Sequence, residues 1–215
     1  MEISIMIPIV AIIVLSVVLH EMAHGYAANW LGDPTARLQG RLSANPLVHL
    51  DLLGSIIIPA LLVFSNSPFL FGWAKPVPYN PYNLNNQRWG EAIVAAAGPA
   101  VNILLAIIFA VLIRSVDVLG LSEQFLELAL YVVFINVLLA MFNMLPFPPL
   151  DGSKVLMSVL PLGAQMQYRR FVSIFEQYGL FAMFAFIFLF VWLFGDLFFG
   201  FMRTIVELLT GVKMF

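Results

Sequence analysis

The chain has 215 residues, of which 62% are hydrophobic and 10% charged, and its net charge is −2. Soluble domains are about 25% charged, so this composition excludes an ordinary soluble domain and indicates one integral membrane domain. The small negative charge provides no basic surface for nucleic acid, and the absence of cysteine excludes disulfides and thiolate metal ligands.

The first membrane span is expected at the N-terminus. Residues 3–19 carry no charge and have the length and composition of a transmembrane helix. We expect this helix to continue to Leu31, because Gly32 and Pro34 then stop it. The segment lacks a positively charged start, so it is not expected to be a cleavable signal peptide.

A metal-binding motif lies in the second half of this helix, in the sequence His20-Glu21-Met22-Ala23-His24. Histidines four residues apart lie on one helix face and can bind one metal ion. A metal lowers the pKa of a bound water, and the carboxylate of Glu21 can then take its proton. Ionisable groups in a membrane span are costly and usually functional, although a pair of structural histidines is the alternative.

Further spans follow at residues 91–113 and 124–145, and a last one at 179–201. Residues 162–178 are amphipathic and are expected at the membrane interface. Residues 35–50 are expected to form an interfacial loop or short strands. The expected fold is therefore all-α, a polytopic bundle of four to five transmembrane helices.

Residues 52–71 are expected to re-enter or cross the membrane. Their apolar part is short and contains Pro59, and the proline-rich residues 71–81 cannot be helical. With the N-terminus outside, the inner loops hold seven basic residues and the outer side holds three. The positive-inside rule then places the active site towards the cytoplasm. The segment must therefore return to its starting side, as a hairpin or through an extended stretch.

Asp151 is the favoured third metal ligand, because a catalytic zinc usually has three protein ligands and one open position. It follows the prolines of residues 146–149, which unwind a span at membrane depth, where irregular backbone must be buried or line a cavity. Its ordinary alternative is a helix cap or turn residue before Gly152.

Two other groups of residues are weaker candidates for this position. His49 and Asp51 form a rival pair in the interfacial loop, where a histidine is usually solvated. Asp117 and Asp196 are expected near the opposite interface and are poor candidates. Two histidines and a carboxylate without thiolates fit one zinc ion per chain.

Three motifs together resemble the site-2 protease family of intramembrane zinc metalloproteases, peptidase family M50. They are the H-E-x-x-H at residues 20–24, the Gly-Pro-Ala-Val-Asn at 98–102, and the segment 143–152 that ends in Leu-Asp-Gly. The resemblance covers about residues 3–160. It implies one protease domain, with the last membrane helix added to this catalytic core.

The resemblance also implies roles for individual residues. Zinc would be held by His20, His24 and Asp151, with Glu21 as general base. Asn143 would lie by the active site, where its amide could hold substrate or a charged intermediate.

Three more residues are candidate substrate contacts by resemblance. Gly98 and Asn102 match a family motif that lies near the catalytic helices. Trp73 lies in a Gly-Trp-Ala-Lys-Pro-Val-Pro stretch that resembles a loop of the short family branch, which lacks PDZ and CBS domains. This loop is expected to present backbone to an extended substrate. Trp73 could equally anchor the chain at the membrane interface.

The expected function is zinc-dependent intramembrane proteolysis of a transmembrane protein substrate, by a multi-pass protein of the cell membrane. A non-catalytic metal-binding membrane protein or a transporter is the alternative. A transporter usually shows repeated halves, which this sequence lacks. A metalloenzyme that acts on lipid is a weaker third possibility. The sequence assigns neither the natural substrate nor the oligomeric state.

Overall fold

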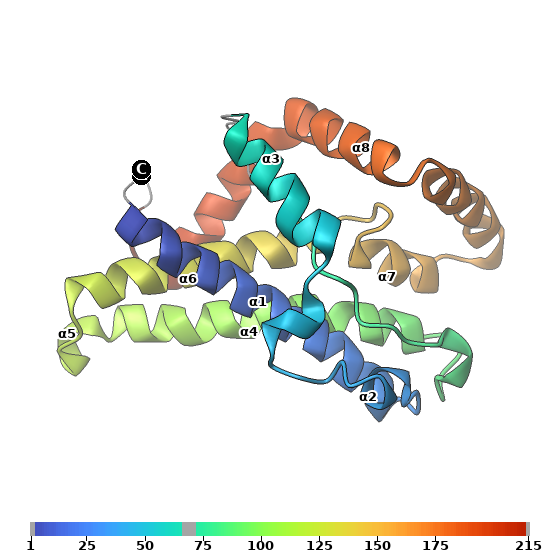
Figure 1. Ribbon diagram of the computed structural model, residues 1–215, viewed down its shortest axis with the longest axis horizontal. Helices are drawn as coiled ribbons and strands as arrows, with labels where there is room; N and C mark the ends of the chain where they lie inside the picture. The colour runs from blue at the N-terminus through green and yellow to red at the C-terminus, as the bar shows by residue number, and fades with distance from the viewer. Residues whose placement is uncertain (1–2, 66–71, 214–215) are drawn as a thin grey trace.

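The computed structural model describes residues 3–65 and 72–213, and this part of the chain contains helices and no strand (Figure 1). Four of its helices are long and apolar enough to cross a membrane. The expected all-α polytopic membrane fold is therefore confirmed. The four long helices are α1 (Ile3–Trp30), α4 (Gly90–Arg114), α6 (Glu123–Asn143) and α8 (Leu162–Thr210).

Short helical turns connect the long helices. Residues 35–50 form two of these turns, so the alternative of short strands was wrong for this loop. Pro46 begins the second turn, and the side chain of Asn45 caps it by accepting from the Leu47 N–H. The short elements are α2 (Thr35–Leu38), η1 (Pro46–His49), η2 (Leu52–Ile57), α3 (Ile58–Phe64), η3 (Pro81–Asn83), α5 (Val116–Leu119) and α7 (Asp151–Val159).

The main apolar core lies between α4 and α6, which run antiparallel and are joined by α5 (Figure 1). Small residues let the two backbones approach closely, as is common between membrane helices. The buried residues recur about one helical turn apart, so each helix presents one continuous packing face. The buried members are Ala106, Ala110 and Ile113 of α4, Ala129, Val133 and Val137 of α6, and Met202 and Val206 of α8.

Large apolar side chains cover the outside of these helices. On α4, Ile103, Ile107 and Val111 are exposed, and on α8 Phe188 and Trp192 are each 73% exposed. A soluble protein rarely exposes such extensive apolar surface. This surface matches the lipid environment that the length of the helices implies.

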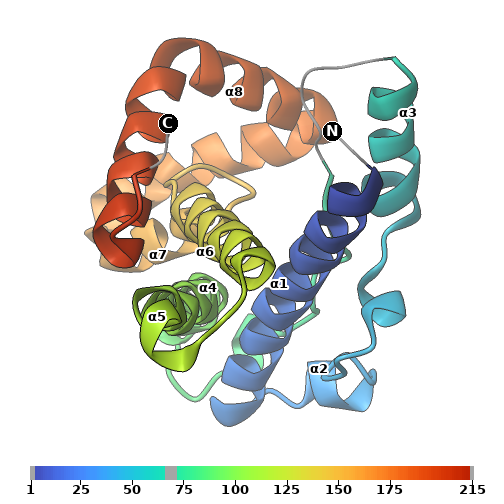
Figure 2. The ribbon, with the colours of Figure 1, turned by 90° about the vertical axis from the view of Figure 1, so that its left-hand side faces the viewer.

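Helix α1 crosses the α4–α6 pair and ends in a turn that is fixed by Asp33 (Figure 2). The Asp33 side chain is fully buried and accepts hydrogen bonds from Thr35 Oγ1 at 2.6 Å, Asn80 N at 2.7 Å and Asn83 Nδ2 at 2.9 Å. Burial raises the pKa of Asp33, but these hydrogen bonds outweigh it and hold the pKa below its usual value. Asp33 thus ties residues 80–83 to the end of α1.

The segment at residues 52–71 begins with a continuous helical run, in which a π-helical turn (η2) passes into α3. Pro59 is the second residue of α3 and lies just after the junction of the two helical elements. Residues 72–80 are extended and irregular, as the prolines predicted. The return between them falls on residues 66–71, which lie outside the described part of the chain. Whether this segment re-enters or spans stays a prediction.

Helix α8 changes direction at Gly179, whose φ of 49° and ψ of −125° are not helical. This glycine separates residues 162–178 from the rest of α8, at the boundary that was predicted, and Figure 1 shows the resulting arch over α7. The span ends at Thr210, not at the predicted residue 201. Arg114 explains the extension, because its guanidinium donates to the carbonyls of Leu208 and Leu209, both at 2.6 Å.

Substitution of Gly54 by alanine is expected to destabilise the protein by about 1–3 kcal/mol, since an added methyl group overpacks a filled contact. A Cβ at this position would overlap the Trp73 ring. The Trp73 N–H also donates to the Gly54 carbonyl at 3.1 Å. Gly163→Ala is the matched control, because a Cβ there meets nothing within 4 Å. Thermal unfolding in detergent measures both; equal midpoints would contradict the expectation.

Candidate metal centre

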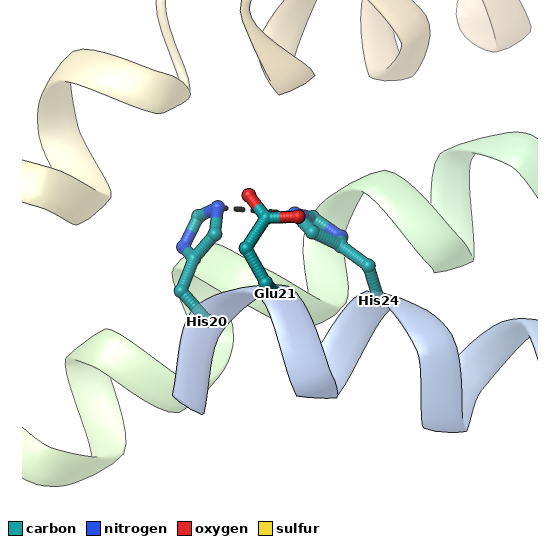
Figure 3. Close-up of side chains that lie close together, drawn as sticks. All are labelled: His20, Glu21 and His24. Atoms are coloured by element: carbon teal, nitrogen blue, oxygen red, sulfur yellow. Dashed lines mark hydrogen bonds between the residues drawn. The ribbon is translucent and has the colours of Figure 1, made fainter. Parts of the chain in front are cut away.

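His20 and His24 project from one face of α1 towards the same point (Figure 3). Their Nε2 atoms lie 3.0 Å apart, and their rings are nearly perpendicular at 87°. Both residues are buried, at 6% and 8% exposed. The helical spacing therefore brings two nitrogen donors together, as the motif predicted.

Asp151 completes a triangle with the two histidines. It is the first residue of α7, and its Oδ2 lies 3.2 Å from each Nε2. Burial raises the pKa of Asp151, but protonated His20 and His24 outweigh burial through their hydrogen bonds and charges, and hold this pKa well below its usual range. A bound metal would take the place of the Nε2 protons, and the ionised carboxylate is the form of Asp151 that binds metal.

The backbone before Asp151 is tightly folded. A Cβ on Gly152 would overlap the carbonyl of Met144, so only glycine fits where α7 begins against the end of α6. The proline-rich turn thus returns the chain towards α1. This close return brings Asp151 to the histidines from a distant part of the sequence.

The three donor atoms fit one zinc ion. Ligand atoms about 2.0–2.1 Å from zinc in a tetrahedral site lie roughly 3.3 Å from one another. The separations between the donors of His20, His24 and Asp151 are 3.0, 3.2 and 3.2 Å. Two imidazoles and one carboxylate also match the donor types that zinc prefers.

Helix α4 supports both histidines from behind. His20 Nδ1 lies 2.6 Å from Asn102 Oδ1, and His24 Nδ1 lies 2.7 Å from the Val94 carbonyl oxygen. A carbonyl oxygen can only accept, so Nδ1 of each ring carries the proton. The Nε2 lone pairs then face Asp151, as metal ligation requires.

Gly98 lies on the face of α4 that packs against the two histidine rings. A Cβ at this position would lie 2.5 Å from His24 Nε2 and 2.6 Å from His20 Cε1. Its absent side chain therefore leaves room for the histidines. The proposed substrate contacts of Gly98 and Asn102 stay predictions; the structure places both residues against the histidine rings.

Glu21 lies beside the two histidines, and Figure 3 shows its carboxylate between their rings. One carboxylate oxygen of Glu21 and one ring nitrogen of each histidine lie within 4.8 Å of one another. Glu21 Oε2 also accepts a hydrogen bond from the Val77 N–H at 2.9 Å. The extended segment after Gly72 thus holds this carboxylate at the site.

A cavity of about 140 Å³ opens in front of these groups. It contains both histidines, Glu21 and Asp151, and Asn143 at the end of α6 also contributes to its wall. Asn143 Nδ2 donates to the Leu139 carbonyl at 2.9 Å, which fixes the amide at the cavity. The complete lining is His20, Glu21, His24, Pro76, Val77, Tyr79, Asn143, Pro149, Asp151 and Lys154.

Trp73, His49 and Asp51, which were also named from the sequence, lie outside this lining. Trp73 packs on Gly54, and Ser55 Oγ donates to its carbonyl at 2.9 Å, so a substrate contact for Trp73 stays a prediction. His49 is 2% exposed, not solvated, and its Nε2 lies 2.9 Å from the Ser43 carbonyl. Asp51 caps the π-helical turn by accepting from the Gly54 N–H at 2.7 Å.

The sequence reasoning missed Lys154 and Tyr79. Lys154 follows Asp151 by three residues, which places both on one face of α7, and this spacing could have revealed it. Its Nζ lies 5.3 Å from the centre of the Tyr79 ring. Burial lowers the pKa of Lys154, but Tyr79 and the carboxylates of Asp151 and Glu91 outweigh burial and raise it. The cavity therefore contains a positive charge.

Comparison with known proteins agrees with this geometry. The sequence profile of peptidase family M50 matches residues 8–127 and 119–188. The chain belongs to peptidase family M50. It is similar to "Putative zinc metalloprotease YwhC" of Bacillus subtilis (strain 168), with 36% identity over 171 residues, which covers 75% of this chain and 73% of that relative.

A second relative is more distant. "Putative zinc metalloprotease Rip2" of Mycolicibacterium smegmatis (strain ATCC 700084 / mc(2)155) is 28% identical over 158 residues, which covers 70% of this chain and 56% of the relative. No solved structure matches the chain. The family and these relatives support a metalloprotease, and hence a hydrolase. Together with the four apolar helices, they support a multi-pass membrane protein.

Substitution of Gly98 by alanine is expected to lower zinc affinity at least about 10-fold, because the new methyl group must displace a histidine ring. Gly200→Ala on α8 is the control, because a Cβ at this position meets nothing within 4 Å. Competition with a zinc chelator, normalised to folded protein, measures the affinity. Unchanged affinity in Gly98→Ala would show that the rings have more room than the structure gives them.

Proposed function

We propose that this metalloprotease cleaves a peptide bond within or near a transmembrane segment of a membrane protein, using one zinc ion per chain. The observation that carries the proposal is the position of the donor triangle. His20, Glu21 and His24 lie on α1, an apolar helix long enough to cross the membrane, and Asp151 of α7 meets the two histidines there. A soluble substrate would not require this cluster on such a helix.

Zinc, when bound by His20, His24 and Asp151, would supply a Lewis acid that polarises the scissile carbonyl and acidifies water. Glu21 takes a proton from the attacking water and passes it to the leaving nitrogen. Asn143 lies on the cavity wall, where its amide can donate to the developing oxyanion. The Val77 N–H keeps the Glu21 carboxylate at the reacting atoms.

The extended segment beside the cavity offers backbone to an unwound substrate. The N–H groups of Trp73, Lys75 and Val77 donate to Gly54 O, His49 O and Glu21 Oε2, so one edge is already paired. The N–H of Ala74 alternates with these donors and lies on the opposite edge. Pro76 and Pro78 have no N–H, and the Pro76 carbonyl already accepts from Arg41 Nη2 at 3.3 Å, so of these two residues Pro78 is the one with a carbonyl to offer.

Cleavage requires the substrate to expose its peptide bond. A transmembrane helix keeps its amides in internal hydrogen bonds, so we expect preferred substrates to contain helix-weakening residues near the cleaved bond. Placing the excess of basic loop residues inside puts the cavity on the cytoplasmic side, where water can enter. The polar lining of the cavity supports this entry.

Substitution of Glu21 by glutamine is expected to keep zinc binding and to reduce cleavage at least about 100-fold, because the amide cannot accept the proton from water. The assay uses detergent-purified protein, its zinc content and a single-span reporter substrate. Glu123→Gln is the control, because Glu123 is exposed at the start of α6.

Each result of this assay decides something. One zinc per chain in both proteins, with cleavage only in the wild type and the control, supports the proposal. An active Glu21→Gln protein would remove Glu21 from its role as general base. Bound zinc with no cleavage of reporters that contain helix-weakening residues would favour a non-catalytic metal-binding protein. Absence of zinc in the wild type would overturn the whole assignment.

A further inference from the structure

We infer that Asn136 and Ser16 are positioning residues for the metal site, because they fix the orientation of the Asn102 amide and thereby the tautomer of His20. This inference rests on the proposed metal site but not on proteolysis. Neither residue belongs to the motifs identified in the sequence, and neither lines the cavity.

A chain of hydrogen bonds connects these residues through the centre of the helix bundle. Asn136 Nδ2 donates to Ser16 Oγ at 2.9 Å, and Asn102 Nδ2 donates to Asn136 Oδ1 at 2.7 Å. Asn102 Oδ1 then lies 2.6 Å from His20 Nδ1. The chain thus joins α1, α4 and α6 at one level.

All four side chains are shielded from the surroundings. Ser16 and His20 are 3% and 6% exposed, and Asn102 and Asn136 are each 0% exposed. An unpaired amide in such an apolar setting costs several kcal/mol, so each group is strongly held to its partner. The network therefore has few alternative arrangements.

The direction of the chain is set by a backbone carbonyl. Asn136 Nδ2 also donates to the Val132 carbonyl at 2.9 Å, and a carbonyl oxygen can only accept. Asn136 must therefore turn its oxygen towards Asn102. Asn102 then presents its NH₂ group to Asn136 and its oxygen to His20.

The last step determines what His20 offers to a metal. Because Asn102 Oδ1 accepts, His20 Nδ1 must carry a proton, and in the neutral ring Nε2 then keeps its lone pair for the metal. If Asn102 were reversed, its NH₂ group would face Nδ1 and favour a proton on Nε2, where it would block metal binding. Asn136 opposes this reversal with a hydrogen bond of 2.7 Å, and the Ser16 carbonyl adds a longer one of 3.5 Å from Asn102 Nδ2. The Ser16 hydroxyl in turn supports Asn136.

The inference differs from a simple packing role. Val133 is also fully buried on α6, but it belongs to the apolar cluster with Ala110 and Val206. Its truncation loosens the bundle without touching the polar chain. Val133→Ala is therefore the matched control for Asn136→Leu, which keeps the approximate size of the side chain and removes its polar groups.

The experiment measures zinc affinity by chelator competition and thermal unfolding of the same samples in detergent. Asn136→Leu is expected to weaken zinc binding about 10-fold, and Asn102→Leu about 10–100-fold, as for other residues that orient metal-binding histidines. Ser16→Ala should have a smaller effect, because the Val132 carbonyl still holds Asn136. Val133→Ala should lower the unfolding temperature and leave zinc affinity unchanged.

A second readout uses the tautomer itself. Nitrogen-15 NMR of histidine-labelled, zinc-loaded wild type is expected to show His20 protonated at Nδ1 and bound through Nε2, with a hydrogen-bonded Nδ1–H signal that shifts in Asn136→Leu. Zinc affinity within twofold of wild type in Asn136→Leu would overturn the inference, as would an equal loss in Val133→Ala. If Asn136→Leu does not fold, a wild-type His20 protonated at Nε2 would overturn it. Loss of cleavage alone would test the proposed function and not this inference.

Discussion

The structure depends on satisfying polar groups inside an apolar bundle. Two histidines and two carboxylates lie where the surrounding helices offer mainly hydrocarbon, so each must have a partner. The histidines use Nδ1 for α4 and leave Nε2 for Asp151. Glu21 is held by the Val77 backbone. The site is thus part of the packing of α1 against α4, and not a separate feature placed on a finished scaffold.

Close helix packing makes this arrangement possible. Gly98 allows α4 to pass directly behind the histidine rings, and Gly152 allows α7 to start against the end of α6. Alanines at positions 106 and 110 bring α4 close to α6. Small residues therefore act at both the apolar core and the metal site, for the same geometric reason: they let backbones approach.

Much of the fold could be predicted from the sequence, because apolar length identifies membrane helices directly. The limits of α4 and α6 were close to those expected, and the division of α8 at Gly179 was anticipated. The end of α8 was missed because it depends on Arg114, a residue of another helix. The helical turns of residues 35–50 were equally hard to see, since local caps decide them.

The residues of the candidate site could also be predicted only in part from the sequence. His20, Glu21 and His24 could be identified because their chemistry lies within one helical turn and a few residues. Asp151 was found from the prolines before it, whereas its distance from the histidines required the structure. Ser16 and Asn136 could have been identified from their positions in apolar helices. Ser16 lies four residues before His20, and Asn136 seven before Asn143, so each extends a polar stripe along an apolar helix.

The hydrogen bond between Val77 and Glu21 has a wider consequence. The same short stretch of backbone holds the general base and forms the edge on which a substrate could align. Ordering of this stretch and orientation of the carboxylate are therefore thermodynamically linked, and the linkage is reciprocal. Anything that stabilises the extended backbone, including a bound peptide, also favours the hydrogen-bonded orientation of the Glu21 carboxylate. Binding of a substrate along this edge would thus help to hold the general base in position.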